Sequence, residues 1–148
     1  MNWTKDRSIR LSKVCTVAMA AALAALCVVS PWSHLFSAKG VLGGITINWY
    51  TVSLVVFAIP AYIALWHLYR LLNNISRDRV FVSENVRCLR RISWCCFAAA
   101  AVFLASTAYS ISWVVLTVAA LFGGLIMRVV KNVFSAAVAL QDEHNLTI

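Results

Sequence analysis

Two stretches of this chain carry side chains of opposite charge that could pair with each other or with a binding partner. The basic stretch supplies the candidate docking residues Phe81, Asn85, Arg87, Arg90 and Arg91. The acidic stretch supplies the candidate docking residues Gln141, Asp142 and Glu143. Because guanidinium and carboxylate groups form charge-assisted hydrogen bonds, we expect the two carboxylates to bind the arginines within the protein or to exchange them for a basic partner. If both stretches are simply solvated, each such pair contributes about 0–1 kcal/mol.

No combination of residues in the sequence predicts catalysis or metal binding. His34, His67 and His144 fall in different parts of the predicted topology, and no spacing typical of metal ligands occurs. The apolar stretches hold no paired carboxylates, and no Gly-rich loop suits a nucleotide. We interpret the five cysteines as small apolar side chains, including the adjacent Cys95 and Cys96. We therefore expect a protein that is not an enzyme and that has no metal site and no cofactor.

The elements that carry these residues are four long apolar stretches. Hydrophobic residues make up 62% of the chain, whereas soluble domains are about half apolar. The stretches lie at approximately 14–29, 51–72, 92–109 and 113–127, and about 20 residues are needed to cross a bilayer as a helix. The sequence therefore predicts an all-α integral membrane protein in which residues 1–148 form a single membrane domain. An outer loop (30–50), an inner loop (73–91) and an inner tail (128–148) complete this plan.

Local signals add detail to the plan. Ser83 is a good N-cap, so the third helix is predicted to begin in the cytoplasm and run into the membrane. Beyond Met127, apolar and polar residues repeat at helical spacing, which predicts a C-terminal amphipathic helix that continues from the fourth span. The first stretch resembles a signal peptide but lacks a good cleavage site, so we expect it to be retained. The alternating stretch 45–50 is interpreted as strand-like or interfacial.

Charge is distributed very unevenly about these stretches. Twelve of the thirteen Lys and Arg residues and all five acidic residues fall on one side, and Lys39 is the exception. Since Lys- and Arg-rich loops stay in the cytoplasm, both termini and the inner loop are predicted to be cytoplasmic. The net charge of +8 is interpreted as orientation signals and contacts with lipid headgroups of the bilayer. No aromatic–basic pattern supports direct binding of nucleic acid.

Polar residues inside the predicted spans are few. Pro60 should bend the second span, and together with Tyr62 and Thr117 it marks a candidate intramembrane pocket. None of the polar side chains at this depth ionises near neutral pH. Ion paths and proton relays in membranes normally contain ionisable side chains, so the pattern argues against a pump or a proton-coupled carrier.

Two segments resemble the signatures of a bacterial membrane protein family known as domain of unknown function 2975. In 134–148, an aromatic residue begins an Ala-rich turn and is followed by Leu-Gln, acidic residues, Leu-Thr and a final aliphatic residue. In 81–90, an aromatic residue is followed four positions later by Asn and then by Leu-Arg. His144-Asn145 departs from the expected acidic pattern, and Ser93 stands where the family often has glycine. The resemblance covers essentially the whole chain and implies a four-span protein of the bacterial inner membrane.

Members of that family are commonly encoded beside a small helix-turn-helix regulator. The resemblance therefore implies a membrane-embedded sensor or regulatory partner that controls such a regulator through its cytoplasmic face. The alternative is an exporter of small molecules or peptides, or an immunity-type membrane protein, that uses the pocket at Pro60, Tyr62 and Thr117. Small residues at Gly123-Gly124 and Ala98–Ala101 allow close helix contact, either within one bundle or in a homo-oligomer.

Overall fold

A computed structural model describes residues 3–30, 39–42, 45–77 and 79–147. These residues form four helices, α1 (Trp3–Val29), α2 (Trp49–Ser76), α3 (Ser83–Ser106) and α4 (Trp113–Leu146), and two short strands, β1 (Lys39–Leu42) and β2 (Ile45–Asn48). Each of the four helices contains a segment long and apolar enough to cross a membrane. The prediction of four helical membrane spans is therefore confirmed by length and composition.

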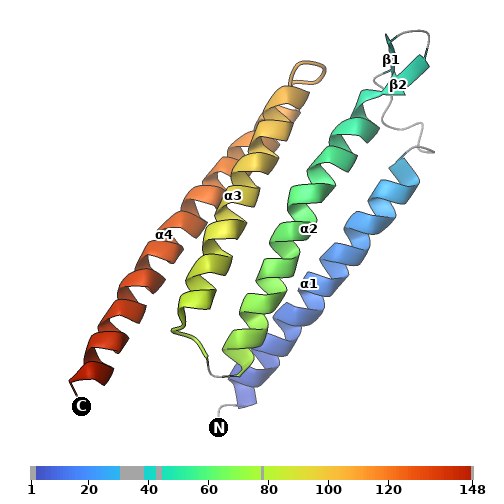
Figure 1. Ribbon diagram of the computed structural model, residues 1–148. Coiled ribbons are helices and arrows are strands. Elements are labelled where there is room, and N and C mark those ends of the chain that lie inside the picture. The colour runs from blue at the N-terminus through green and yellow to red at the C-terminus, as the bar shows by residue number, and fades with distance from the viewer. Residues whose placement is uncertain (1–2, 31–38, 43–44, 78, 148) are drawn as a thin grey trace.

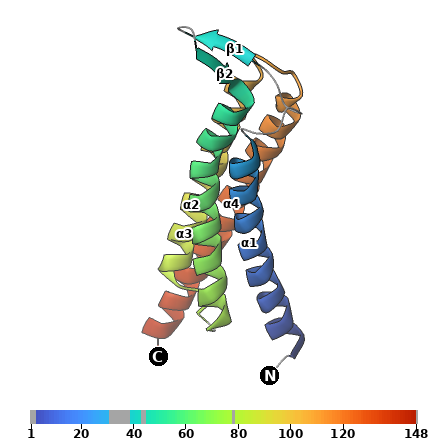
Figure 2. The same ribbon diagram turned by 90° about the vertical axis from the view of Figure 1, so that its right-hand side faces the viewer.

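The helices follow one another side by side in chain order (Figure 1). α2 packs against α3 and α3 packs against α4, while α1 packs mainly against α2. The two chain ends and the α2–α3 connection lie at one end of the bundle, which we call the termini end (Figures 1 and 2). The strands and the α3–α4 connection lie at the opposite end, the hairpin end.

Two short strands accompany the four helices of this all-α membrane fold. β1 and β2 pair antiparallel, with Gly40 opposite Ile47 and Val41 opposite Thr46, and β2 leads directly into α2. The predicted strand-like stretch 45–50 is thus a strand as far as Asn48, whereas Trp49 and Tyr50 already belong to α2. The outer loop also includes residues outside the described ranges.

The helices are longer than the predicted spans. α4 is one helix of 34 residues, so the fourth span and the predicted amphipathic helix are continuous. α3 begins at Ser83, but Ser83 is not its N-cap. Val82 occupies that position with an extended backbone, and no side chain caps the helix. The expected cap is therefore wrong by one residue, a common uncertainty at helix ends.

A small apolar cluster joins three helices at the termini end. Leu71 of α2 is buried together with Cys88 and Leu89 of α3. Side chains of α4 pack against this cluster, among them Val130 and Phe134. Because burial of such side chains favours the folded state by about 25 cal/mol per Å² of apolar surface, the cluster fixes the positions of α2, α3 and α4 at the end where the charged residues lie.

α3 and α4 approach each other closely at Gly124. A Cβ atom on Gly124 would lie 3.2 Å from the ring of Phe97 and 3.3 Å from Cys96 Cβ. At the same level, Ser93 Oγ donates a hydrogen bond of 3.0 Å to the carbonyl oxygen of Gly124. Gly123 faces open space, with nothing within 4 Å of a Cβ placed there. The close contact is therefore specific to Gly124 and lies within one chain.

Candidate functional site

Asn85 organises the α2–α3 connection from inside the protein. Its side chain is 0% exposed. Its Nδ2 donates hydrogen bonds to the carbonyl oxygens of Arg79 (2.8 Å) and Val80 (2.7 Å), and its Oδ1 accepts one from Asn74 Nδ2 (2.8 Å). A buried amide is stable when its donors and acceptor are all satisfied, and here they are. We expected Asn85 on the docking face, and the structure corrects this because the side chain is enclosed and fully occupied.

Glu84 provides the acidic partner in this region. Its carboxylate pairs with Arg70 of α2 through Oε1 and accepts a longer hydrogen bond of 3.5 Å from Asn74 Nδ2 through Oε2. Both side chains of the Arg70–Glu84 pair are about half exposed, so water screens the pair and its contribution to stability is small. The pair nevertheless joins α2 and α3 at the termini end of the bundle, beside Asn85.

The other residues of the predicted basic stretch remain at the surface. Phe81 is exposed, and its ring lies 6.0 Å from that of Phe134 in α4. Arg87, Arg90 and Arg91 are exposed on α3. Arg91 Nη1 lies 3.4 Å from Nε2 of His67. The structure therefore keeps Phe81 and the three arginines available at or near the termini end.

His67 of α2 is buried and faces α3, whereas the neighbouring Trp66 is exposed. Since an arginine can only donate, Nε2 of His67 accepts in its contact with Arg91, and the proton of the neutral ring lies on Nδ1. Nδ1 is buried and has no hydrogen-bond partner among the described residues.

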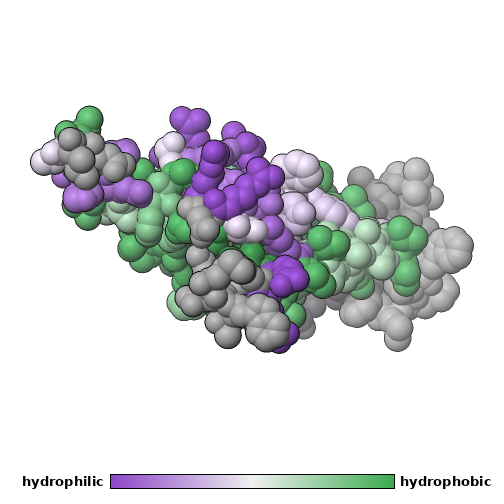
Figure 3. All heavy atoms as spheres, turned by 90° about the horizontal axis from the view of Figure 1, so that it is seen from below, coloured by the Kyte–Doolittle hydropathy of each residue, from purple (hydrophilic) through white to green (hydrophobic). Residues whose placement is uncertain are grey.

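The acidic residues near the end of α4 are separated from the arginines. Gln141, Asp142 and Glu143 are exposed, and among the described residues neither carboxylate forms an ion pair. Asp142 follows Phe134 by eight residues, or about 12 Å of helix, so it lies well beyond the contact with Phe81. The expected pairing with Arg87, Arg90 or Arg91 within the protein is therefore not formed. Figure 3 looks onto this end and shows hydrophilic side chains gathered over it.

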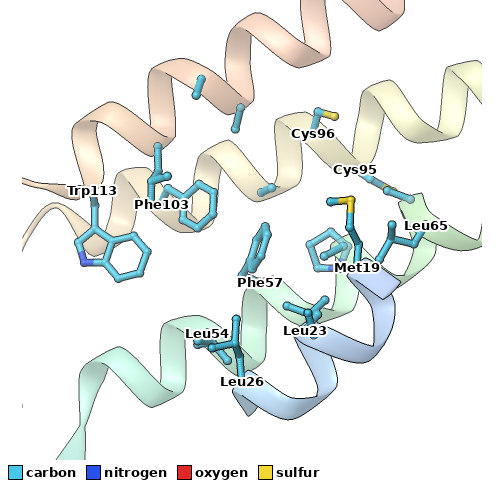
Figure 4. A pocket seen from close by; sticks show the side chains of 18 residues that line it. Met19, Leu23, Leu26, Leu54, Phe57, Leu65, Cys95, Cys96, Phe103 and Trp113 are labelled. Carbon is cyan, nitrogen blue, oxygen red and sulfur yellow. The ribbon is translucent and has the colours of Figure 1, made fainter. Parts of the chain in front are cut away.

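An apolar cavity of about 690 Å³ lies between the α1–α2 and α3–α4 helix pairs. All four helices contribute to its wall, with Leu23 from α1, Phe57 from α2, Phe103 from α3 and Leu116 from α4 among the lining residues. Figure 4 shows these helices directing side chains into one space. The wall contains no charged side chain, so a ligand of this cavity would be apolar.

Of the three residues predicted to mark an intramembrane pocket, one lines this cavity. Pro60 lines the cavity. Tyr62 lies outside it, and its hydroxyl donates a hydrogen bond of 3.0 Å to the carbonyl oxygen of Ala20, which ties α2 to α1. Thr117 is buried, and its hydroxyl donates to the carbonyl oxygen of Trp113, one turn earlier in α4. Both hydroxyls thus satisfy backbone groups, and the two residues are removed from the candidate pocket.

The fold and composition indicate a multi-pass membrane protein built on four candidate spanning helices. In the described part of the chain, no group of three or more His, Cys, Asp or Glu side chains could hold a metal ion. The chain belongs to a family described as a protein of unknown function (DUF2975), whose family model matches residues 14–148. No curated protein and no solved structure matches the chain.

Proposed function

We propose that this protein is a membrane-embedded sensor or regulatory partner that binds a small helix-turn-helix regulator at its termini end. The observation that supports this most directly is the end of α4. The helix continues beyond its contact with Phe81 and presents Gln141, Asp142 and Glu143 to solvent, and no cation among the described residues pairs with either carboxylate. We call these last turns of α4, residues 135–146, the α4 arm.

The proposal requires the termini end to face the cytoplasm of a bacterial cell. The distribution of positive charge supports this orientation, because Arg70 and Arg87 lie toward the termini end of their helices, as do most other cations of the chain. Short loops and helix ends rich in Lys and Arg stay on the cytoplasmic side of the inner membrane. A cytoplasmic regulator would then reach the α4 arm and the exposed Phe81 from the same side.

Charge complementarity supports a DNA-binding protein as the partner. A helix-turn-helix regulator carries a basic surface that neutralises DNA phosphates. Asp142 and Glu143 are exposed and form no ion pair with the part of the chain that the structure describes, so they offer such a surface an alternative to phosphate. Complementary charges speed the encounter of two proteins and select against partners of the wrong sign. Binding to the α4 arm would therefore compete with binding to DNA.

The experiment is co-purification of the helix-turn-helix regulator with the full chain from detergent extract. Loss of the last eight residues, or the milder change Asp142→Asn with Glu143→Gln, should reduce recovery of the regulator about tenfold. Asn132→Ser, at an exposed position of α4 outside the arm, is the control and should leave recovery unchanged. Equal recovery with the wild type and both altered arms would rule out docking at the α4 arm.

The apolar cavity supports a second candidate function, export of a small apolar molecule or immunity to one. Its lining from all four helices and its lack of charge suit such a ligand. Ala99→Leu fills part of the cavity, whereas Ala98→Leu on the exposed side of α3 does not. If the cavity serves efflux or resistance, Ala99→Leu lowers that activity severalfold and Ala98→Leu does not. Equal activity of the two variants excludes this second function.

A further inference from the structure

We propose that a basic groove between α3 and α4 binds the phosphate headgroup of an anionic phospholipid in the leaflet at the termini end. The groove has a volume of about 270 Å³ and is lined by Arg90, Ser93, Trp94, Arg128 and Lys131. This site differs from the proposed regulator site on the α4 arm. In this proposal Arg90 binds a lipid, although the sequence predicted it to be a docking residue for a partner.

The groove brings cations from two helices together without a protein anion. Arg90 comes from α3, and Arg128 and Lys131 come from α4. None of the three forms an ion pair within the described part of the chain, where Glu84 is engaged by Arg70. Like charges that share one groove repel each other, so an anion that enters between them relieves the repulsion.

The depth of the groove favours a phosphate at the membrane boundary. Arg128 follows Trp113 by fifteen residues, or about 22 Å of helix, and Lys131 lies almost one turn further along. Arg90 precedes Ser106 by sixteen residues, or about 24 Å. Since the hydrocarbon core is about 30 Å thick, the three cations lie close to one boundary when the hairpin end lies at the other. Headgroup phosphates are the anions that are abundant at this depth.

The surroundings of the groove favour a lipid over a soluble anion. Trp94 lies at the edge of the groove and is 62% exposed, and indole rings prefer the membrane interface. Leu125, one turn from Arg128 on the same flank of α4, is 55% exposed, and Leu121 is exposed one turn further toward the hairpin end. An acyl chain can lie along this flank while its phosphate occupies the groove.

Contacts between the helices hold the groove in shape. The guanidinium carbon of Arg128 lies 6.0 Å from the centre of the Phe97 ring, in a cation–π contact that orients the charge. Ser93 donates its hydroxyl proton to Gly124 O at 3.0 Å, which fixes the distance between α3 and α4 at the floor of the groove. Phosphate would therefore be bound by the three cations and not by the hydroxyl proton of Ser93.

Native mass spectrometry of the full chain in detergent tests the proposal. Phosphatidylglycerol is the anionic probe, phosphatidylcholine the zwitterionic one, and inorganic phosphate the soluble one. We expect phosphatidylglycerol to be retained at least about tenfold more than phosphatidylcholine, and inorganic phosphate at millimolar concentration not to displace it. The change Arg128→Gln with Lys131→Gln should reduce retention of phosphatidylglycerol about tenfold or more, since each cation near the surface strengthens binding severalfold.

Two control variants separate this site from general charge attraction and from misfolding. Arg10→Gln with Arg77→Gln removes two exposed charges outside the groove and should leave retention unchanged. Arg128→Lys with Lys131→Arg keeps both charges and should retain the lipid. Wild-type retention by the double Gln variant, or an equal loss in the control outside the groove, would overturn the proposal. So would equal retention of phosphatidylcholine, loss of lipid from the charge-preserving variant, or displacement by inorganic phosphate, which would indicate a site for a soluble anion.

Discussion

Asn74 in the last turn of α2 donates its side-chain amide to Asn85 in the first turn of α3 at 2.8 Å. Asn85 in turn donates to two carbonyl oxygens of the connection between these helices. Asn85→Ala would remove all three hydrogen bonds of this buried side chain, and we expect it to lower the free energy of unfolding in detergent micelles by about 2–3 kcal/mol. Asn132→Ala, at an exposed position of α4, is the control. Equal stability of the two variants would show that Asn85 does not organise the connection.

Gly124 and Gly123 form a matched pair for testing the contact between α3 and α4. Gly124→Ala places a Cβ within 3.2–3.3 Å of Phe97 and Cys96, so these neighbours must move by a few tenths of an ångström, and we expect a cost of about 1–3 kcal/mol. Gly123→Ala meets nothing within 4 Å and should be neutral or slightly stabilising, because Ala favours helix more than Gly does. The measurement is the midpoint of thermal unfolding for each variant. A similar midpoint for both would refute the close approach at Gly124.

Ser53 forms hydrogen bonds with two other hydroxyl groups at the hairpin end. Tyr109 donates to Ser53 Oγ at 2.7 Å, and the hydroxyl oxygens of Ser53 and Ser106 lie 2.8 Å apart in a second hydrogen bond. Ser53→Ala should lower stability by about 1 kcal/mol, in the usual range for hydrogen bonds between membrane helices. Combining Ser53→Ala with Tyr109→Phe should cost less than the sum of the single changes, because both remove one interaction. Strictly additive costs would mean that the Tyr109–Ser53 bond contributes nothing.

The helical spans could be predicted from the sequence because each requires only a long apolar run. α1 begins well before its predicted span, since hydropathy marks the apolar part of a helix and not its polar ends. The extension of α4 beyond Met127 was predicted from its amphipathic pattern. The strand pair had a usable signal, because Gly43-Gly44 precedes the β-branched run Ile45-Thr46-Ile47, and such dipeptides favour hairpins.

The roles of individual polar residues were harder to predict because they depend on partners distant in the chain. Asn85 looked like a surface residue of an amphipathic helix start, but its partner Asn74 lies on another helix. Glu84 pairs with Arg70 in α2, a contact that no local pattern indicates. Thr117 carries a readable signal, since a threonine hydroxyl in a membrane helix commonly bonds to the carbonyl one turn earlier.

The groove between α3 and α4 also could not be predicted from the chain order. Arg90 is separated from Arg128 and Lys131 by most of two helices, and the antiparallel packing of α3 on α4 brings them to one level. In the sequence, Arg128 and Lys131 indicated only orientation and the polar side of an amphipathic helix. Their shared groove depends on the close approach at Gly124, which is a property of the packed bundle.

The central claim is that the α4 arm is a cytoplasmic docking element, and photo-cross-linking in living cells tests it most directly. A photoreactive amino acid replaces Asp142 in one strain and Ile111, which is exposed at the hairpin end, in another. We predict that position 142 yields a covalent adduct with a helix-turn-helix regulator, identified by mass spectrometry, and that position 111 yields none. Absence of that adduct at position 142, or its appearance at position 111, would contradict the claim.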